Sequence, residues 1–141
     1  MLGAKTLIRI GTCGATRDDI RATDLIVATS ACAFAGTTRQ YLDGEPYAPT
    51  AAFRVARALV EAAERLGARC HVGPVATEDA LYAVTSEWRE RWAARGVLAQ
   101  EMEASAVFTV AALRGLEAGC LLTVSNAADQ HERLPAGRQR R

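Results

Sequence analysis

Four short apolar runs divide the chain, and each is bounded by small or polar residues. They cover residues 6–12, 24–30, 68–76 and 119–125. The runs are more nearly continuous than alternating, which is the pattern of strands covered on both faces of a sheet. We therefore predict four buried strands.

Helical patterns fill the intervals between these strands. Residues 49–67 carry an apolar stripe at helical spacing, and residues 86–96 form a shorter helical segment. Each segment ends at a glycine, a residue typical of helix C-termini. A third predicted helix, over 101–115, is apolar on nearly all sides, which predicts that it is buried. Alternating strands and helices predict an α/β fold.

Composition limits the class of protein without identifying it. The chain has 141 residues, half of them hydrophobic and 23% charged, as in a globular protein with one core. The net charge of +1 gives no general attraction to nucleic acid or to a membrane surface. No apolar run is long enough to cross a bilayer, and the first residues do not resemble a signal peptide. We expect one domain over residues 1–141.

The cysteines and histidines argue against a metal site. The four cysteines are Cys13, Cys32, Cys70 and Cys120. They lie far apart in apolar surroundings, without a CxxC pair, and the only histidines are His71 and His131. Reduced cysteines in a cytoplasmic protein are the simplest interpretation.

Small polar residues follow three of the four predicted strands. After the first strand, residues 9–15 (RIGTCGA) combine the cation of Arg9, the hydroxyl of Thr12 and two glycines that permit close backbone approach to an anion. Residues 77–82 (TEDALY) and 123–129 (TVSNAAD) follow two other strands. Each segment alone is also typical of an ordinary turn or helix cap. Together they predict a ligand site at the carboxyl ends of the strands.

Two carboxylates stand where the third helix is predicted to begin, in the segment LAQEMEASAV (98–107). Acidic side chains are favourable at a helix N-terminus, so Glu101 and Glu103 could simply stabilise the helix. They could equally belong to the ligand site. The local pattern leaves both interpretations open.

Taken together, these motifs resemble the nucleoside phosphorylase family, which includes bacterial hexameric purine nucleoside phosphorylase and uridine phosphorylase. The RIGT-x-G loop, the EMEA segment and the strand ending in VSN occur in the family's order, over roughly residues 6–133. The resemblance implies a three-layer α/β/α fold with a mixed central sheet. It also implies that the chain is partial, without the family's N-terminal segment and its long closing helix.

The resemblance implies a role for each matching residue. Phosphate would be bound by Arg9 and Thr12. The ribose would be bound by Glu101, Met102 and Glu103, with Glu103 accepting hydrogen bonds from the 2′ and 3′ hydroxyls. The positions matching the base-binding residues are Cys13, Gly14, Leu81, Tyr82, Ser125 and Asn126.

Asn126 is the main departure, because many purine-cleaving members have an aspartic acid there that protonates the leaving base. An amide can donate a hydrogen bond but cannot supply a proton while staying neutral. We expect Asn126 to be the catalytic residue on the base side and to favour 6-oxopurines, which can spread negative charge over O6 and N7. Uridine phosphorylases also carry asparagine here, but segment 82–96 is too short for their uracil-reading insertion.

The expected activity is phosphorolysis of a 6-oxopurine nucleoside to free base and ribose 1-phosphate. Inorganic phosphate is the co-substrate, and no metal or organic cofactor is expected. The alternatives are a uridine phosphorylase or related nucleosidase, and an inactive fragment that only binds nucleoside or assembles. We expect a homo-oligomer built from dimers, with a hexamer as one arrangement, or a partner chain that supplies the missing segment. The basic tail, residues 132–141, is expected to be a frayed end.

Overall fold

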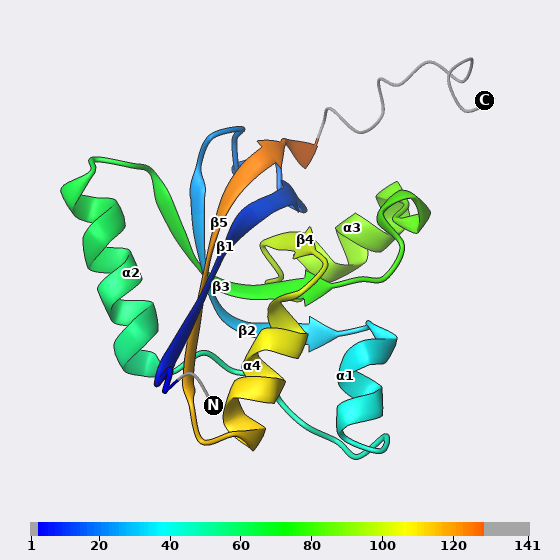
Figure 1. The fold of residues 1–141 in the computed structure, drawn as a ribbon. Coiled ribbons are helices and arrows are strands. Elements are labelled where there is room, and N and C mark those ends of the chain that lie inside the picture. Colours follow the sequence, from blue (N-terminus) through cyan, green and yellow to red (C-terminus); the bar gives the residue numbers. More distant parts are fainter. Residues whose placement is uncertain (1–2, 129–141) are drawn as a thin grey trace, which may run out of the picture.

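The computed structural model describes residues 3–128, which form one mixed sheet with helices packed on both faces (Figure 1). The strands are β1 (Thr6–Ala15), β2 (Leu25–Ala33), β3 (Cys70–Thr77), β4 (Ala99–Glu101) and β5 (Glu117–Asn126). The helices are α1 (Gly36–Tyr41), α2 (Phe53–Arg65), α3 (Ser86–Ala93) and α4 (Ala104–Leu113), with a short 3₁₀ turn η1 (Leu81–Ala83). The predicted basic tail lies outside the described residues.

The five strands close on one another in the order β1-β4-β3-β2-β5. The parallel neighbours are β1 with β5, β2 with β3, and β3 with β4. Antiparallel pairing joins β1 to β4 and β2 to β5. The predicted mixed α/β sheet is therefore confirmed.

Helices α2 and α4 lie on opposite faces of the sheet (Figure 1). A Cβ at Gly119 of β5 would lie 2.5 Å from Cγ1 of Val55, so the backbone of β5 approaches α2 closely. On the other face, Phe108 of α4 is fully buried in the core beside strands β1, β2, β3 and β5. The predicted helix over 101–115 is thus largely buried, as expected.

All four predicted strands and all three predicted helices are present, with shifted ends. The helix predicted from residue 101 begins instead at Ala104, because Glu101 is the last residue of β4. Strand β4 and helix α1 were not predicted. A strand of three residues and a helix of six are too short to give a periodic signal.

The strands do not all run in one direction. Strand β3 runs parallel to β2, and β2 runs antiparallel to β5, so β3 and β5 point in opposite directions. The carboxyl ends of β1, β3 and β5 nevertheless meet at β4, because Gly14 pairs with both Gln100 and Asn126, and Thr77 pairs with Glu101. The strand ends that carry the polar segments therefore lie together, as the sequence pattern predicted, although the strands are not all parallel.

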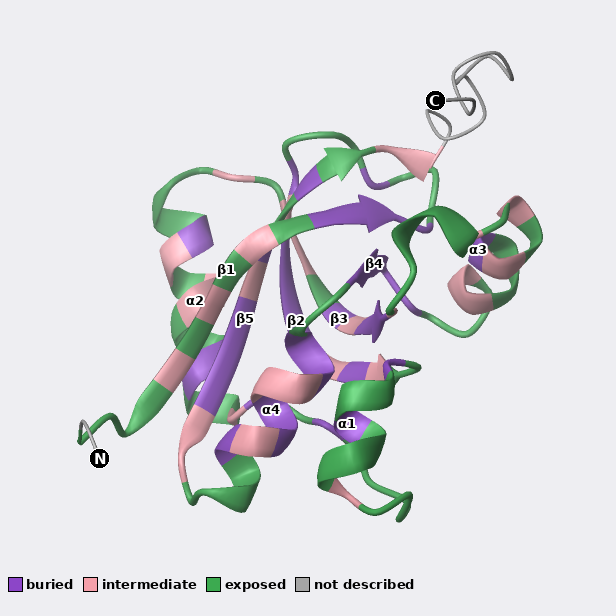
Figure 2. Ribbon diagram, turned by 45° about the vertical axis from the view of Figure 1, so that its right-hand side comes forward, coloured by how far each residue is buried: buried purple, intermediate pink, exposed green. Residues whose placement is uncertain are grey.

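Strand β1 changes character along its length (Figure 2). Its first half alternates, with Ile8 50% exposed and Ile10 77% exposed, whereas its last three residues are buried. Among the described residues it pairs with β5 along its length and with β4 only at Gly14 and Ala15. Within residues 3–128 no helix has both the length and the apolarity needed to span a membrane.

Candidate functional site

An open cleft of about 830 Å³ runs along β1, between β1, the end of β4 and the start of α4. It gathers nearly all the residues that the sequence singled out. Those that line it are Arg9, Thr12, Cys13, Gly14, Leu81, Glu101, Met102, Glu103, Ser125 and Asn126. The motifs that are dispersed over the sequence therefore meet in one place.

Tyr82 is the exception among the predicted site residues. Its side chain is 95% exposed and does not line the cleft, whereas its neighbour Leu81 does. The 3₁₀ turn that holds both residues presents only one of them to the cleft. The predicted contact of Tyr82 with the base has no support in this arrangement.

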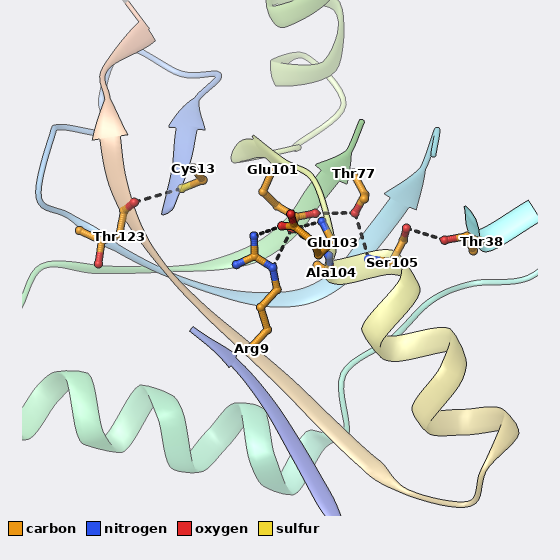
Figure 3. Close-up of polar contacts among 9 residues, drawn as sticks. All are labelled: Arg9, Cys13, Thr38, Thr77, Glu101, Glu103, Ala104, Ser105 and Thr123. Atoms are coloured by element: carbon orange, nitrogen blue, oxygen red, sulfur yellow. Dashed lines mark hydrogen bonds and ion pairs between the residues drawn. The ribbon is translucent and has the colours of Figure 1, made fainter. Parts of the chain in front are cut away.

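Arg9 lies between the two carboxylates of the EME segment (Figure 3). Its Nε is 3.2 Å from Oε2 of Glu101, and its Nη2 donates to Oε2 of Glu103. The arginine side chain is mostly buried, the Glu101 side chain is fully buried, and that of Glu103 is 59% exposed. The guanidinium is therefore fixed on the inner side and accessible on the outer side.

Glu101 is held by protein donors. Its Oε1 accepts a hydrogen bond of 2.5 Å from the Thr77 hydroxyl. Its Oε2 accepts hydrogen bonds of 2.8 Å from the backbone N–H groups of Glu103 and Ala104, in addition to the Arg9 contact. Oε2 is therefore fully occupied by the protein, and the side chain as a whole is fully buried.

The buried polar contacts continue from Glu101 into the first turn of α4 (Figure 3). The Thr77 hydroxyl also accepts from the backbone N–H of Ser105 at 3.0 Å, and the Ser105 and Thr38 hydroxyls are 2.7 Å apart. All three hydroxyl residues are buried. Because buried polar groups are costly unless paired, this complete network fixes the end of β4 relative to α4.

The two interpretations of the EME segment are therefore divided between its two acids. Glu101 binds the first free N–H groups of α4 from the end of β4, which is the helix-stabilising role. The predicted contact of Glu101 with ribose is not supported, because its side chain is fully buried and its Oε2 is occupied by protein donors. Glu103 and Met102 lie in the turn that follows, and both face the open cleft.

Gly11 makes room for the arginine. A Cβ at this position would lie 1.8 Å from Nη1 of Arg9, far inside van der Waals contact. The guanidinium therefore rests directly on the backbone of β1. The sequence motif R-x-G has its physical reason in this contact, since any side chain at residue 11 would displace Arg9.

The ends of β1 and β5 form the other end of the cleft. The Ser125 hydroxyl donates to the carbonyl oxygen of Cys13 at 3.1 Å, and Asn126 is exposed. Burial of the Cys13 thiol, assisted by the nearby Glu101 carboxylate, raises its pKa to about 12 although Arg9 opposes the shift. Cys13 therefore stays a neutral thiol near pH 7 and is no nucleophile.

Two residues at or beside the cleft were not predicted as functional from the sequence. Thr77, buried behind Glu101, was noted only as part of a polar strand end. Gln100 was not noted at all, although it lines the cleft next to Glu101. Neither residue has a local pattern that separates it from an ordinary strand residue. Across residues 3–128, no group of three or more histidine, cysteine, aspartate or glutamate side chains is arranged to hold a metal ion.

Comparison with known proteins places these residues in a family context. The profile described as the Phosphorylase superfamily matches residues 1–139. The chain is 45% identical over 124 residues to a protein named purine nucleoside phosphorylase DeoD-type from Geobacillus kaustophilus, covering 88% of this chain and 52% of that protein. A protein of the same name from Alkaliphilus metalliredigens is 41% identical over 125 residues, covering 89% and 54%.

A relative with a different printed name also matches. The guanosine phosphorylase of Halorubrum lacusprofundi is 37% identical over 142 aligned positions, which cover 95% of this chain and 58% of that protein. The chain spans about half the length of the curated relatives it matches.

Proposed function

The chain belongs to the phosphorylase superfamily, and we propose that it cleaves the N-glycosidic bond of a purine nucleoside with inorganic phosphate. The products are the free base and ribose 1-phosphate. The observation that carries this proposal is the cleft in which Arg9, Glu103 and Asn126 lie along one path. The names of the relatives, which refer to purine nucleosides and to guanosine, favour a purine substrate.

Arg9 is the proposed phosphate ligand. Its guanidinium is permanently charged, and it can form paired hydrogen bonds with two phosphate oxygens. Glu101 holds its Nε on the inner side, which leaves the Nη groups for the anion. The exposed Thr12 hydroxyl, three residues further along β1, can donate to a further oxygen.

Glu103 is the proposed ribose ligand, with Met102 packed against the sugar. A carboxylate suits a vicinal diol because its two oxygens can each accept one hydroxyl. Glu103 is exposed to the cleft and its one recorded partner among the described residues is Arg9. The flexible thioether of Met102 can adapt to the irregular sugar surface.

The Arg9–Glu103 ion pair then has to separate when both substrates bind. Phosphate takes over the Nη groups of Arg9, and the ribose diol takes over the carboxylate of Glu103. Binding of phosphate to Arg9 therefore frees Glu103 for the ribose, and binding of the ribose to Glu103 frees Arg9 for phosphate. We expect phosphate and nucleoside to strengthen each other's binding through this exchange.

The base is proposed to lie at the other end of the cleft, near Gly14, Ser125 and Asn126. The Asn126 amide can donate to N7 or O6 and so stabilise the charge that develops on a leaving 6-oxopurine. Cys13 and Leu81 supply apolar wall beside it. If this role is correct, Asn126→Asp should add cleavage of adenosine, and a variant without that gain would argue against it.

The proposed reaction uses phosphate as the attacking group at C1′ while the glycosidic bond breaks. Phosphate on Arg9, the diol on Glu103 and the base on Asn126 would bracket an oxocarbenium-like sugar. The catalytic contribution is then positioning and electrostatic stabilisation by fixed groups. We propose that no metal ion or organic cofactor takes part.

The test is release of hypoxanthine from inosine by the purified chain, with and without phosphate, and with uridine in parallel. The proposal predicts release only when phosphate is present, a loss of about tenfold or more in Glu103→Gln, and little reaction with uridine. Release without phosphate would indicate a nucleosidase, and preferential cleavage of uridine would indicate the pyrimidine activity. No release from either nucleoside would reject phosphorolysis by this chain and favour a binding or assembly role.

We also propose that the chain self-associates or takes up a partner chain along β1. Ile8 and Ile10 are exposed there, and apolar side chains on an incompletely paired strand favour association. A dimer-based assembly, up to a hexamer, is the expected form. A single monodisperse monomer in light scattering at micromolar concentration, with or without substrates, would contradict this proposal.

The cellular compartment stays a prediction. The four cysteines are unpaired in the structure, which suits a reducing compartment such as the cytoplasm. Cell fractionation with an antibody against the chain would test it, and recovery from a secreted fraction would contradict it.

A further inference from the structure

Gln100 is an unusual residue in the wall of the cleft. The residue is only 4% exposed. The Oε1 atom of its side chain is buried and has no hydrogen-bond partner among the described residues. Buried side-chain amides normally have their donors and acceptors paired. The neighbouring buried polar residues Thr77, Glu101 and Ser105 all follow this rule. Among these four neighbouring residues, Gln100 alone has an unpaired side-chain atom.

The strand register places Gln100 in line with the proposed base site. Gly14 of β1 pairs with Gln100 of β4 on one side and with Asn126 of β5 on the other. The β1–β5 register shifts by one residue just before Gly14, and Gln100, Gly14 and Asn126 nevertheless all line the cleft. Neighbouring strands are about 5 Å apart, so the backbones of Gln100 and Asn126 stand roughly 10 Å apart. Gly14, which has no side chain, lies between them.

This row suits a flat heterocycle. Gly14 leaves the floor between the amides without a side chain, and Gln100, Gly14 and Asn126 all line the cleft. A planar ring over Gly14 would present one edge toward Asn126 and a second edge toward Gln100. A carboxamide offers an acceptor and a donor side by side, which matches a ring edge that also carries one of each.

We propose that Gln100 is a specificity-determining residue that hydrogen-bonds the N1/O6 edge of the base, while Asn126 contacts N7. This proposal rests on the proposed function, because its ligand is the base of the nucleoside. The preferred ligand class is a purine whose six-membered ring carries adjacent N–H and carbonyl groups, as in a 6-oxopurine. Its N1–H would donate to the unpaired Oε1, and its O6 would accept from the amide N–H.

An apolar side chain would be the better choice if Gln100 only filled space. A methionine has nearly the same length and volume and would leave no polar atom unpaired. Thr109 provides a matched comparison, because its hydroxyl is also buried and unpaired but the residue does not line the cleft. Both sites bury an unpaired polar atom, but only Gln100 belongs to a residue that lines the cleft, where a rotation of its side chain would bring the amide to a ligand.

The experiment measures binding of free bases to the purified chain by calorimetry, so that it does not depend on turnover. The ligands are hypoxanthine, which has N1–H and O6, and unsubstituted purine, which lacks both. In Gln100→Met we expect hypoxanthine to bind about tenfold more weakly, as for a lost bidentate contact, while purine changes less than about twofold. Thr109→Val, the control, should leave both dissociation constants unchanged.

Several outcomes would overturn the role of Gln100. These are equal weakening of both bases, unchanged binding of hypoxanthine in Gln100→Met, and failure of the unmodified chain to bind either base. Melting curves of both variants check that the fold is retained, and Gln100→Glu keeps the shape if the methionine variant does not fold. We expect this carboxylate to weaken hypoxanthine binding selectively as well, because it cannot donate to O6.

The result also separates this inference from the proposed function. Selective loss of hypoxanthine binding together with no cleavage of inosine would support Gln100 and reject phosphorolysis. Phosphate-dependent cleavage of inosine together with equal losses for both bases would retain phosphorolysis and reject the role of Gln100.

Discussion

The two faces of the sheet are built from different interactions. On the α2 face, the backbone of β5 at Gly119 meets the apolar side chains of Val55 and Leu59. On the α4 face, near the cleft, Thr77, Glu101 and the start of α4 are joined by hydrogen bonds and an arginine. The α2 face contributes stability through close packing, whereas the α4 face also holds the Arg9 guanidinium in a defined position.

This contrast assigns different consequences to similar changes. A substitution on the α2 face should reduce the free energy of unfolding and leave the reaction per folded molecule intact. A substitution near Glu101 should reduce both, because the same contacts fix the helix and the arginine. The predictions below use this difference, from the largest expected effect to the smallest.

Glu101→Ala should have the largest effect. It removes the partner of a mostly buried arginine, of the Thr77 hydroxyl and of two backbone N–H groups at once. We expect the free energy of unfolding to fall by about 3 kcal/mol, as for other broken buried ion pairs, and kcat/KM to fall more than tenfold. Urea unfolding and inosine phosphorolysis measure the two. A loss of stability below about 1 kcal/mol would mean that Glu101 does not fix the end of β4 to the start of α4.

Gly119→Ala should affect stability alone. The added methyl group would lie 2.5 Å from Val55 Cγ1 and 3.1 Å from Leu59 Cδ1, so α2 has to move outward. Overpacking of this kind costs about 1–3 kcal/mol. Denaturant unfolding should show that loss, while kcat/KM of the folded fraction stays the same. Reduced turnover in a fully folded variant would show that the two faces are coupled.

Gly11→Ala should act mainly on the reaction. Here the added methyl group meets the guanidinium of Arg9, which has to leave the β1 backbone and weaken its pair with Glu101. Glu101 keeps its other donors, so we expect a stability loss of about 1 kcal/mol, together with an increase of about tenfold in KM for phosphate. Steady-state kinetics at varied phosphate tests this. An unchanged KM for phosphate would remove Arg9, in the position seen here, from the phosphate site.

The smallest effect concerns a second charge cluster away from the cleft. Asp24 Oδ2 is 2.8 Å from Nε2 of His71 and 3.4 Å from Nε of Arg69, and it accepts from the backbone N–H of Arg21. Burial alone would raise the pKa of Asp24, but the Arg21 N–H, His71 and Arg69 together lower it below its ordinary value of 3.8. None of these residues lines the cleft.

The lowered pKa of Asp24 sets the sign of its pH effect. The folded protein binds a proton on Asp24 less readily than the unfolded chain, so the carboxylate stabilises the fold above pH 3.8. This contribution disappears as the pH falls below 3.8 through the folded-state pKa. Asp24→Asn should therefore flatten the acid side of the stability curve, without changing kcat/KM near neutral pH. Identical acid profiles of the two proteins would contradict this assignment.

Elements that pack through apolar side chains were predicted from the sequence more accurately than the elements around the polar contacts of the α4 face. Strands β2, β3 and β5 and helix α2 bury apolar side chains, and their apolar runs and helical stripe predicted them closely. The first part of β1 was predicted to be buried, but Ile8 and Ile10 are exposed there. The start of α4 was misplaced because Glu101 belongs to β4, a strand too short to show a pattern. When a short strand with buried polar residues directly precedes an apolar helix, the sequence pattern resembles that of one longer helix.

Most residues that line the cleft could be predicted from the sequence, but the different contacts of Glu101 and Glu103 could not. Family motifs located Arg9, Glu103 and Asn126, which line one cleft. Spacing alone could not show that Glu101 is held by Thr77 and Arg9, because those partners come from the distant strands β3 and β1. Gln100 was missed for the same reason, since its position beside Gly14 arises only from strand pairing.

The fate of the sugar tests the central claim most directly. Phosphorus NMR of a reaction with inosine and phosphate distinguishes ribose 1-phosphate from unreacted inorganic phosphate, while hypoxanthine is measured in the same sample. The arrangement of Arg9 and Glu103 predicts ribose 1-phosphate in the same molar amount as hypoxanthine. Hypoxanthine accompanied by free ribose, with the phosphate signal unchanged, would contradict it.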